Sequence, residues 1–88
     1  MRIWFKLWKD ARMLRDFTVE NAEEDTRTHK IFHAIDRACM EFDLSHPQWL
    51  EKTVNEFRKH GKARFYQDNF MDDIEFDFME MEVLEDDY

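Results

Sequence analysis

The sequence predicts a two-layer α+β fold in which strands and helices follow the chain order β-β-α-α-β. Two runs near the start and one near the end alternate apolar with polar residues, as half-buried strands do. Between them, two stretches place apolar residues at helical spacing. We therefore expect a three-stranded, mainly antiparallel sheet with two helices on one face, formed by residues 1–88 as a single domain, because a chain this short can bury only one core.

The first two strands are expected at residues 2–9 and 12–20, joined as a hairpin. In the first run, Ile3, Phe5 and Leu7 occupy alternate positions, and β-branched and aromatic residues are frequent in both runs. The connection lacks the Asn-Gly or Asp-Gly pair of the commonest two-residue turns. The register of the hairpin therefore stays open by a residue or two.

The first helix is expected to follow Asp25 or Thr26, either of which can cap its N-terminus. At about 100° per residue, its apolar residues form one narrow stripe. That stripe consists of Ile31, Ile35, Ala38 and Phe42, with Phe32 and Cys39 at its margin.

A second helix is expected to begin at Ser45, followed by Pro47 and by Gln48 at the capping-box position. Its apolar face would comprise Leu50, Val54, Phe57, Gly61 and Phe65. Gly61 has two interpretations: a left-handed C-cap that ends the helix, or a site of close approach inside a longer helix.

The last strand is expected at residues 73–84. Its apolar residues first occupy one parity and then the other: Ile74, Phe76 and Phe78, followed by Met79, Met81 and Val83. Such a shift indicates a β-bulge or a strand with both faces partly covered.

Composition excludes several classes of protein. The single Gly leaves no material for a phosphate-binding glycine-rich loop, and no apolar run is long enough to span a membrane. Cys39 is the one cysteine and cannot form an intramolecular disulfide. We expect a protein of the reducing cytoplasm that has no cofactor and no membrane partner.

Charge is distributed unevenly along a chain of net charge −8. Residues 52–67 hold five basic residues against one acid, whereas residues 68–88 hold ten acids and no base. The run Lys62–Tyr66 combines cations with aromatic rings, as single-strand binders do, but acids follow at once, so we expect its cations to be neutralised within the chain. The acid-only final third suggests an alternative function, a mimic of nucleic acid that inhibits a DNA- or RNA-binding protein.

Catalytic candidates are few. Ser45 is the only serine and is expected to cap a helix, and Cys39 lies in an apolar setting where a thiol stays protonated. His46 and His60 could serve as bases, but nothing ties either of them to a nucleophile. Among the acids of the last strand, Glu75 and Asp77 are expected to face outward and to pair with Lys6 or Arg15 across the sheet. We therefore expect no enzyme.

His29, His33 and Asp36 have the helical spacing that could bring three ligands to one metal ion. Together with Met40, they lie opposite the apolar stripe of the first helix. A solvated helix face is the favoured interpretation, and a metal-dependent enzyme is a weak alternative.

The second face of the sheet is the candidate contact surface. If Ile3, Phe5 and Leu7 pack under the helices, the side chains between them on this strand point to the opposite face of the sheet. Met79 and Met81 of the last strand would then lie on that opposite face as well. The predicted surface is Trp4, Lys6, Trp8, Met79 and Met81. Such a patch normally marks a partner surface, so we expect self-association as a homodimer or docking of a protein partner. In the opposite register the tryptophans are core.

Four segments also carry a resemblance: MRIWFKLWKD at the start, TRTHK at Thr26–Lys30, EFDLS at Glu41–Ser45, and the run from Arg64 through Gln67 and Asp68 to Phe70. In these segments the chain resembles a group of small uncharacterised proteins of anaerobic Gram-positive bacteria, nearly end to end. The resemblance implies a bacterial, cytoplasmic setting. That group has no assigned activity, so no catalytic residue carries over.

Overall fold

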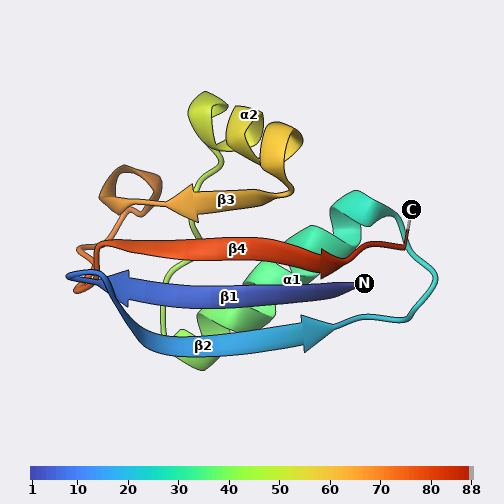
Figure 1. Cartoon of the computed structure of the whole chain (residues 1–88), viewed down its shortest axis with the longest axis horizontal. Helices are drawn as coiled ribbons and strands as arrows, with labels where there is room; N and C mark the ends of the chain where they lie inside the picture. Colours follow the sequence, from blue (N-terminus) through green and yellow to red (C-terminus); the bar gives the residue numbers. More distant parts are fainter. Residues whose placement is uncertain (88) are drawn as a thin grey trace.

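The computed structural model describes residues 1–87 and shows a four-stranded antiparallel sheet with two helices (Figure 1). The strands are β1 (Arg2–Lys9), β2 (Arg12–Glu20), β3 (Lys62–Phe65) and β4 (Phe78–Glu85), in the spatial order β2-β1-β4-β3. The helices are α1 (Arg27–Phe42) and α2 (Glu51–His60), and a short 3-10 helix, η1, spans Gln67–Asn69. The α+β class, the antiparallel pairing and the two helices are confirmed. The expected count of three strands is wrong, because β3 is a fourth.

The β1–β2 hairpin turns at Asp10 and Ala11, whose φ angles are 51° and 63°. Two consecutive left-handed residues are typical of turns that match the right-handed twist of the flanking strands. Asp tolerates this conformation, whereas Ala11 adopts it at a cost of about 1 kcal/mol. The pairing of β1 with β2 shifts register between Leu7 and Trp8, so that Leu7 lies opposite Arg15 and Trp8 lies opposite Met13.

Helix α1 follows its sequence pattern closely. Thr26 is the N-cap and accepts a hydrogen bond from the backbone N–H of His29, as one of the two expected caps. All four residues of the expected apolar stripe are buried against the sheet, together with Cys39 at its margin. Phe32, at the other margin, stays 42% exposed.

Helix α2 begins at Glu51, so the expected start near Ser45 is wrong. The backbone between Ser45 and Glu51 is hydrogen-bonded to Asn69 instead. The N–H of Gln48 donates to the carbonyl of Asn69 (2.6 Å), and the Asn69 side chain donates to the carbonyl of Gln48 (2.8 Å). Gly61 ends the helix with φ 68°, which confirms the C-cap alternative. Phe65 therefore lies in β3, not on the helix, and is fully buried.

The expected strand at 73–84 is also shorter than predicted, because β4 begins only at Phe78. Ile74 and Phe76 precede it in an irregular segment, in which the N–H of Asp77 donates to the carbonyl of Trp8 (2.8 Å). The change of parity itself lies inside β4: Phe78 faces away from the helices and Met79 faces them, so this strand carries apolar side chains on both faces.

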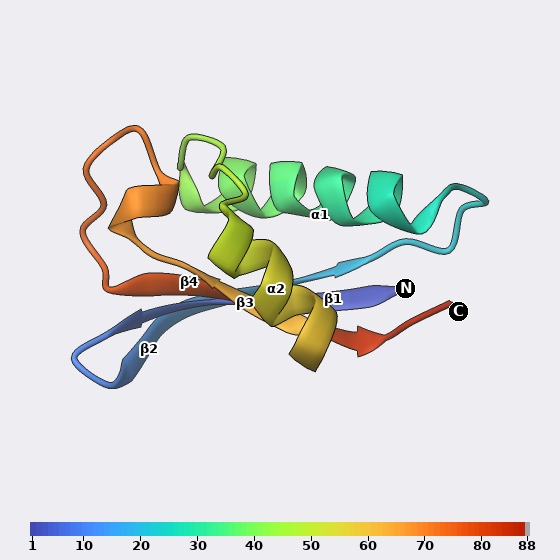
Figure 2. The same ribbon diagram turned by 90° about the horizontal axis from the view of Figure 1, so that it is seen from above.

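Helix α1 crosses one face of the sheet (Figure 1), and α2 lies beside the β3 edge (Figure 2). Met79 pairs with Leu7 and Met81 with Phe5, and residues directly opposite each other share a face. The two methionines are therefore fully buried under the helices. Their predicted place beside Trp4 and Trp8 is wrong. Among residues 1–87, no helix is long and apolar enough to cross a membrane.

Candidate functional site

The face of the sheet that no helix covers carries the candidate site. Ile3, Phe5 and Leu7 point to the helices, so Trp4, Lys6 and Trp8 point the other way, in the register that the surface hypothesis requires. Both tryptophans are partly buried. With Met79 and Met81 on the covered side, the open face is a pattern of charges and rings and not one apolar patch. We call it the open face; it comprises the side chains of Trp4, Lys6, Trp8, Asp16, Arg64, Tyr66, Phe78, Glu80 and Glu82.

Four charged residues form one row across all four strands of the open face. Strand pairing sets Arg64 of β3 opposite Glu80 of β4, Glu80 opposite Lys6 of β1, and Lys6 opposite Asp16 of β2. The signs therefore alternate along the row. Glu80 accepts from Lys6 (Nζ–Oε1, 2.9 Å) and from Arg64 (Nε–Oε2, 3.1 Å), and Lys6 also pairs with Glu82 (3.1 Å). This matched row was missed from the sequence, because it requires the register of every strand.

The centre of the row is buried although no helix covers it. Lys6 is 7% exposed and Glu80 is 5% exposed. Burial by itself would raise the pKa of Glu80, but hydrogen bonds from Lys6 and Arg64 outweigh it and lower that pKa. Burial would likewise lower the pKa of Lys6, but its hydrogen bonds to Glu80 and Glu82 outweigh it and raise that pKa. Both groups are therefore ionised at neutral pH.

Aromatic rings flank the charged row and provide its cover. On one side, the Lys6 ammonium lies 4.0 Å from the ring centroid of Trp4, whose Nε1 donates to Asp16 (3.0 Å). On the other side, Trp8 stacks on Phe78 (6.5 Å between centroids), and Tyr66 lies 5.4 Å from Phe78.

The Trp8 indole nitrogen is buried and has no hydrogen-bond partner within the described chain. The open face thus combines the aromatic and Arg side chains that are enriched at protein interfaces.

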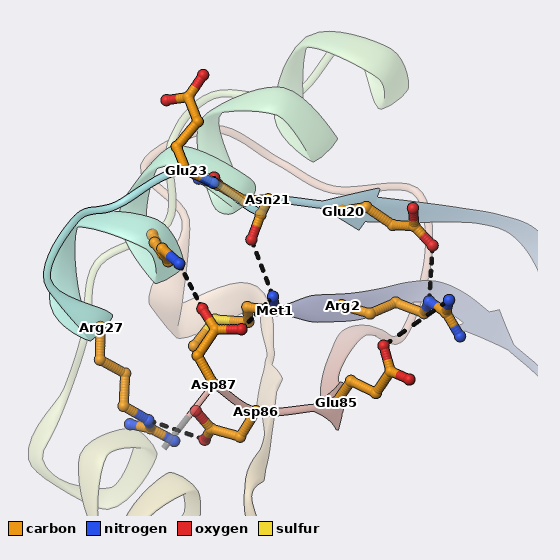
Figure 3. A network of polar contacts seen from close by, with 10 residues as sticks. Met1, Arg2, Glu20, Asn21, Glu23, Arg27, Glu85, Asp86 and Asp87 are labelled. Atoms are coloured by element: carbon orange, nitrogen blue, oxygen red, sulfur yellow. Dashed lines mark hydrogen bonds and ion pairs between the residues drawn. The ribbon is translucent and has the colours of Figure 1, made fainter.

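A second polar cluster closes the end of the sheet where the two termini meet (Figure 3). The Met1 ammonium donates to the carbonyl of Asn21 (2.9 Å) and to Asp87 (2.6 Å), and Lys30 also binds Asp87. Hydrogen bonds from Lys30 and from the Met1 ammonium lower the pKa of Asp87. Nearby, Arg27 pairs with Asp86 (2.9 Å). Since each of these charged groups has a partner of opposite charge, we interpret this cluster as an ion-pair network that fixes the C-terminal segment.

The candidate metal ligands His29, His33 and Asp36 do not form a common site. His29 pairs with Asp25 (3.0 Å), while Asp36 pairs with His46 (2.6 Å), and His33 is exposed. Across residues 1–87, no three His, Cys, Asp or Glu side chains form a group that could hold a metal ion.

Cys39, Ser45, Glu75 and Asp77 are the candidates for nucleophilic and acid-base chemistry. Burial, with a smaller effect of the Asp36 charge, raises the pKa of Cys39 to about 11, so its thiol is protonated at neutral pH. Ser45 lies outside α2, and the expectation that it caps this helix is wrong. Glu75 and Asp77 precede β4, and Lys6 pairs instead with Glu80 and Glu82. Their expected place on a strand is therefore wrong.

The acidic final third of the chain is largely matched by cations from elsewhere. Six of its ten carboxylates have a cationic partner: Asp68, Glu80, Glu82, Glu85, Asp86 and Asp87. The expected neutralisation within the run Lys62–Tyr66 is seen for Arg64, which binds Glu80. These ion pairs interrupt the continuous negative surface that a mimic of nucleic acid would need.

Comparisons with known proteins add no assignment to this geometry. No family model, no curated protein and no solved structure matches the chain.

Proposed function

We propose that this protein is a small self-associating module of the cytoplasm whose two copies join through the open face. The observation that carries the proposal is the alternating row Arg64, Glu80, Lys6 and Asp16 with its aromatic flank. The free, buried thiol of Cys39 suits a reducing compartment.

Each charge of the row meets an opposite charge when the row of a second copy is laid over it in reverse order. A two-fold axis that runs along the strands, midway between β1 and β4, places β1 over β4 of the second copy and β2 over β3. Asp16 then faces Arg64 and Lys6 faces Glu80, in both directions. A two-fold axis across the strands would instead place like charges over each other. The charges therefore favour one mode of pairing between two identical faces.

The same axis also brings the apolar groups together. It places Trp8 over Phe78 of the second copy, because these two residues are paired neighbours on β1 and β4. Partly exposed rings would be removed from water in the dimer, at about 25 cal/mol per Å² of apolar surface. The rings supply the driving force, and the charged row sets the register.

The open face also avoids the repulsion that a chain of net charge −8 imposes on self-association. Along the charged row, the cations Arg64 and Lys6 are opposed by two carboxylates, Glu80 and Asp16. The net charge of this row is zero. Two copies can therefore approach by this face with less electrostatic repulsion than the whole chain would produce.

Sedimentation equilibrium with two charge-reversal variants tests the proposal. Asp16→Arg alone would place Arg over Arg64 of the second copy, and Arg64→Asp alone would place Asp over Asp16. Each variant should dimerise at least about tenfold more weakly than the wild type, a loss of roughly 1.4 kcal/mol. An equimolar mixture of the two variants should form a heterodimer, because both contacts are then between opposite charges.

The control is Glu24→Arg in the loop between β2 and α1, which makes the same change in net charge away from the open face. It should dimerise as the wild type does or slightly better. A wild type that stays monomeric at millimolar concentration, or variants whose mixture fails to associate while both remain folded, would refute the proposed face.

A further inference from the structure

An apolar groove lies between α1 and α2, on the side of the molecule opposite the open face. The two helices diverge, with α2 beside the β3 edge (Figure 2), and the groove between them has a volume of about 280 Å³. Its apolar wall is formed by Ile31 and Phe32 of α1, Val54 and Phe57 of α2, and Trp49 from the preceding segment. This volume is close to the roughly 300 Å³ at which small-molecule sites begin.

The groove has a rigid aromatic wall. The Trp49 ring meets Phe32, Phe57 and Phe65 edge to face, with centroid distances of 6.3, 5.7 and 5.2 Å. Phe65 belongs to the core and is fully buried, so it anchors Trp49 to the sheet. Phe32, in contrast, exposes 42% of its surface, although its neighbour Ile31 is buried. An aromatic ring left exposed at the edge of a preformed apolar wall is typical of a binding groove.

Two guanidinium groups stand at this groove in a chain that is otherwise acidic. Arg27 is held by Asp86 (2.9 Å) and lies over the ring of Phe57, 5.2 Å from its centroid. Arg58, in the last turn of α2, is exposed and has no carboxylate partner within residues 1–87. The first turn of α1, with its positive end of the helix dipole, lies beside them.

From this combination we infer that the groove binds a small carboxylate with an apolar body, such as a medium-chain alkanoate. The apolar part lies against Trp49, Phe32 and Phe57, and the carboxylate pairs with Arg58, whose planar fork of donors matches it. Charge complementarity selects an anion over a neutral or cationic molecule of the same shape. This site is independent of the open face, because the sheet separates the two.

Decanoate is the probe, titrated into ¹⁵N-labelled protein below the concentration at which it forms micelles. The expected result is saturable shifts in the amide signals of Phe32, Val54 and Phe57. Decyltrimethylammonium, with the same chain and the opposite charge, should bind at least about tenfold more weakly. Arg58→Glu should weaken decanoate binding by a similar factor, since a charge-assisted pair becomes a like-charge contact.

Lys59→Glu is the matched control, because it makes the same charge change at the next residue, which does not line the groove. Its affinity for decanoate should stay within about twofold of the wild type. Asp16→Arg, which acts on the open face, should also leave decanoate binding unchanged, so this test and the test of self-association can fail separately. Absence of saturable shifts, equal losses in Arg58→Glu and Lys59→Glu, or shifts centred on Trp4 and Trp8 would overturn the inference.

Discussion

The two faces of β1 differ in how they exclude water, although they belong to one extended strand. On the covered face, Phe5 is fully buried in the apolar core and lies opposite Met81. On the open face, the adjacent residue Lys6 is almost as buried, but among carboxylates and under the ring of Trp4. Burial of Phe5 is stabilised by packing in the apolar core, whereas burial of Lys6 depends on its charged and aromatic partners.

This difference has a consequence for stability and for specificity. The covered face gains free energy roughly in proportion to its apolar area, with little dependence on which neighbour supplies it. A buried ion pair contributes little net stability, because desolvation offsets attraction, but it strongly penalises a wrong partner. We therefore assign the energy of folding to the covered face and the choice of partner to the open face.

The largest expected effect is that of Phe5→Ala on the covered face. Removing a fully buried ring from a close-packed core should lower the free energy of unfolding by about 3–5 kcal/mol. Urea denaturation followed by circular dichroism measures it. Trp4→Ala, one residue away on the open face, is the comparison and should cost less than half as much, because Trp4 is only partly buried. Equal losses would remove the distinction between the faces.

An intermediate effect is expected for Lys6→Met. It leaves Glu80 buried with Arg64 as its remaining partner, so the free energy of unfolding should fall by about 1–3 kcal/mol. Adding Glu80→Met should recover most of that loss, because an apolar pair can replace a buried ion pair. A double-mutant cycle in urea denaturation checks this. If the double variant is less stable than Lys6→Met, the row is a source of stability and our division of roles is wrong.

A smaller effect is expected for Gly61→Ala at the end of α2. At φ 68° an alanine is strained, and the site has no atom within 4 Å of the added methyl group, so only the backbone cost applies. The free energy of unfolding should fall by about 1 kcal/mol, as read from the denaturation midpoint at constant m-value. Because Gly61 belongs to neither face, self-association should be unchanged.

The smallest change is expected on mild acidification. The pKa values of Glu80 and Asp87 are lowered in the folded chain, so their contributions are complete above the unfolded pKa values of 4.5 and 3.8. Stability should therefore be nearly constant from pH 7 to pH 5 and should fall below pH 4.5. The raised pKa of Lys6 gives the alkaline limb of the stability profile, since its contribution to stability is lost as the pH rises above 10.5. Melting temperatures across this range test both limbs, and the variant with Lys6→Met and Glu80→Met should show shallower ones.

The parts of the fold that sequence predicts are those with a long, uniform period. Helix α1 repeats its apolar residues over about three turns, and β1 alternates over eight residues, so the sequence predicts both in the right register. Strand β3 has only four residues, Lys62–Phe65, and its Phe65 also fits the period of α2, so the strand was missed. Helix α2 ends at Gly61, and the left-handed C-cap found there is one of the two interpretations that the sequence allows for this glycine.

The candidate site was only half predicted for a related reason. Trp4, Lys6 and Trp8 share one strand, and a single alternation locates them. Met79 and Met81 were placed on the wrong face, because a strand expected from residue 73 starts at Phe78. Glu80, Arg64 and Asp16 join Lys6 only through the pairing of four strands, and that register is set by turns and bulges such as the shift between Leu7 and Trp8.

The most direct test of the central claim is an isotope-filtered NOE experiment on a mixture of labelled and unlabelled chains. Such an experiment reports only contacts between copies. We predict intermolecular NOEs between the Trp8 indole and the Phe78 ring, and between the Asp16 and Arg64 side chains. Intermolecular NOEs confined to the helix side, at Phe32 or Met40, or none at a concentration where the protein is dimeric, would contradict self-association through the open face.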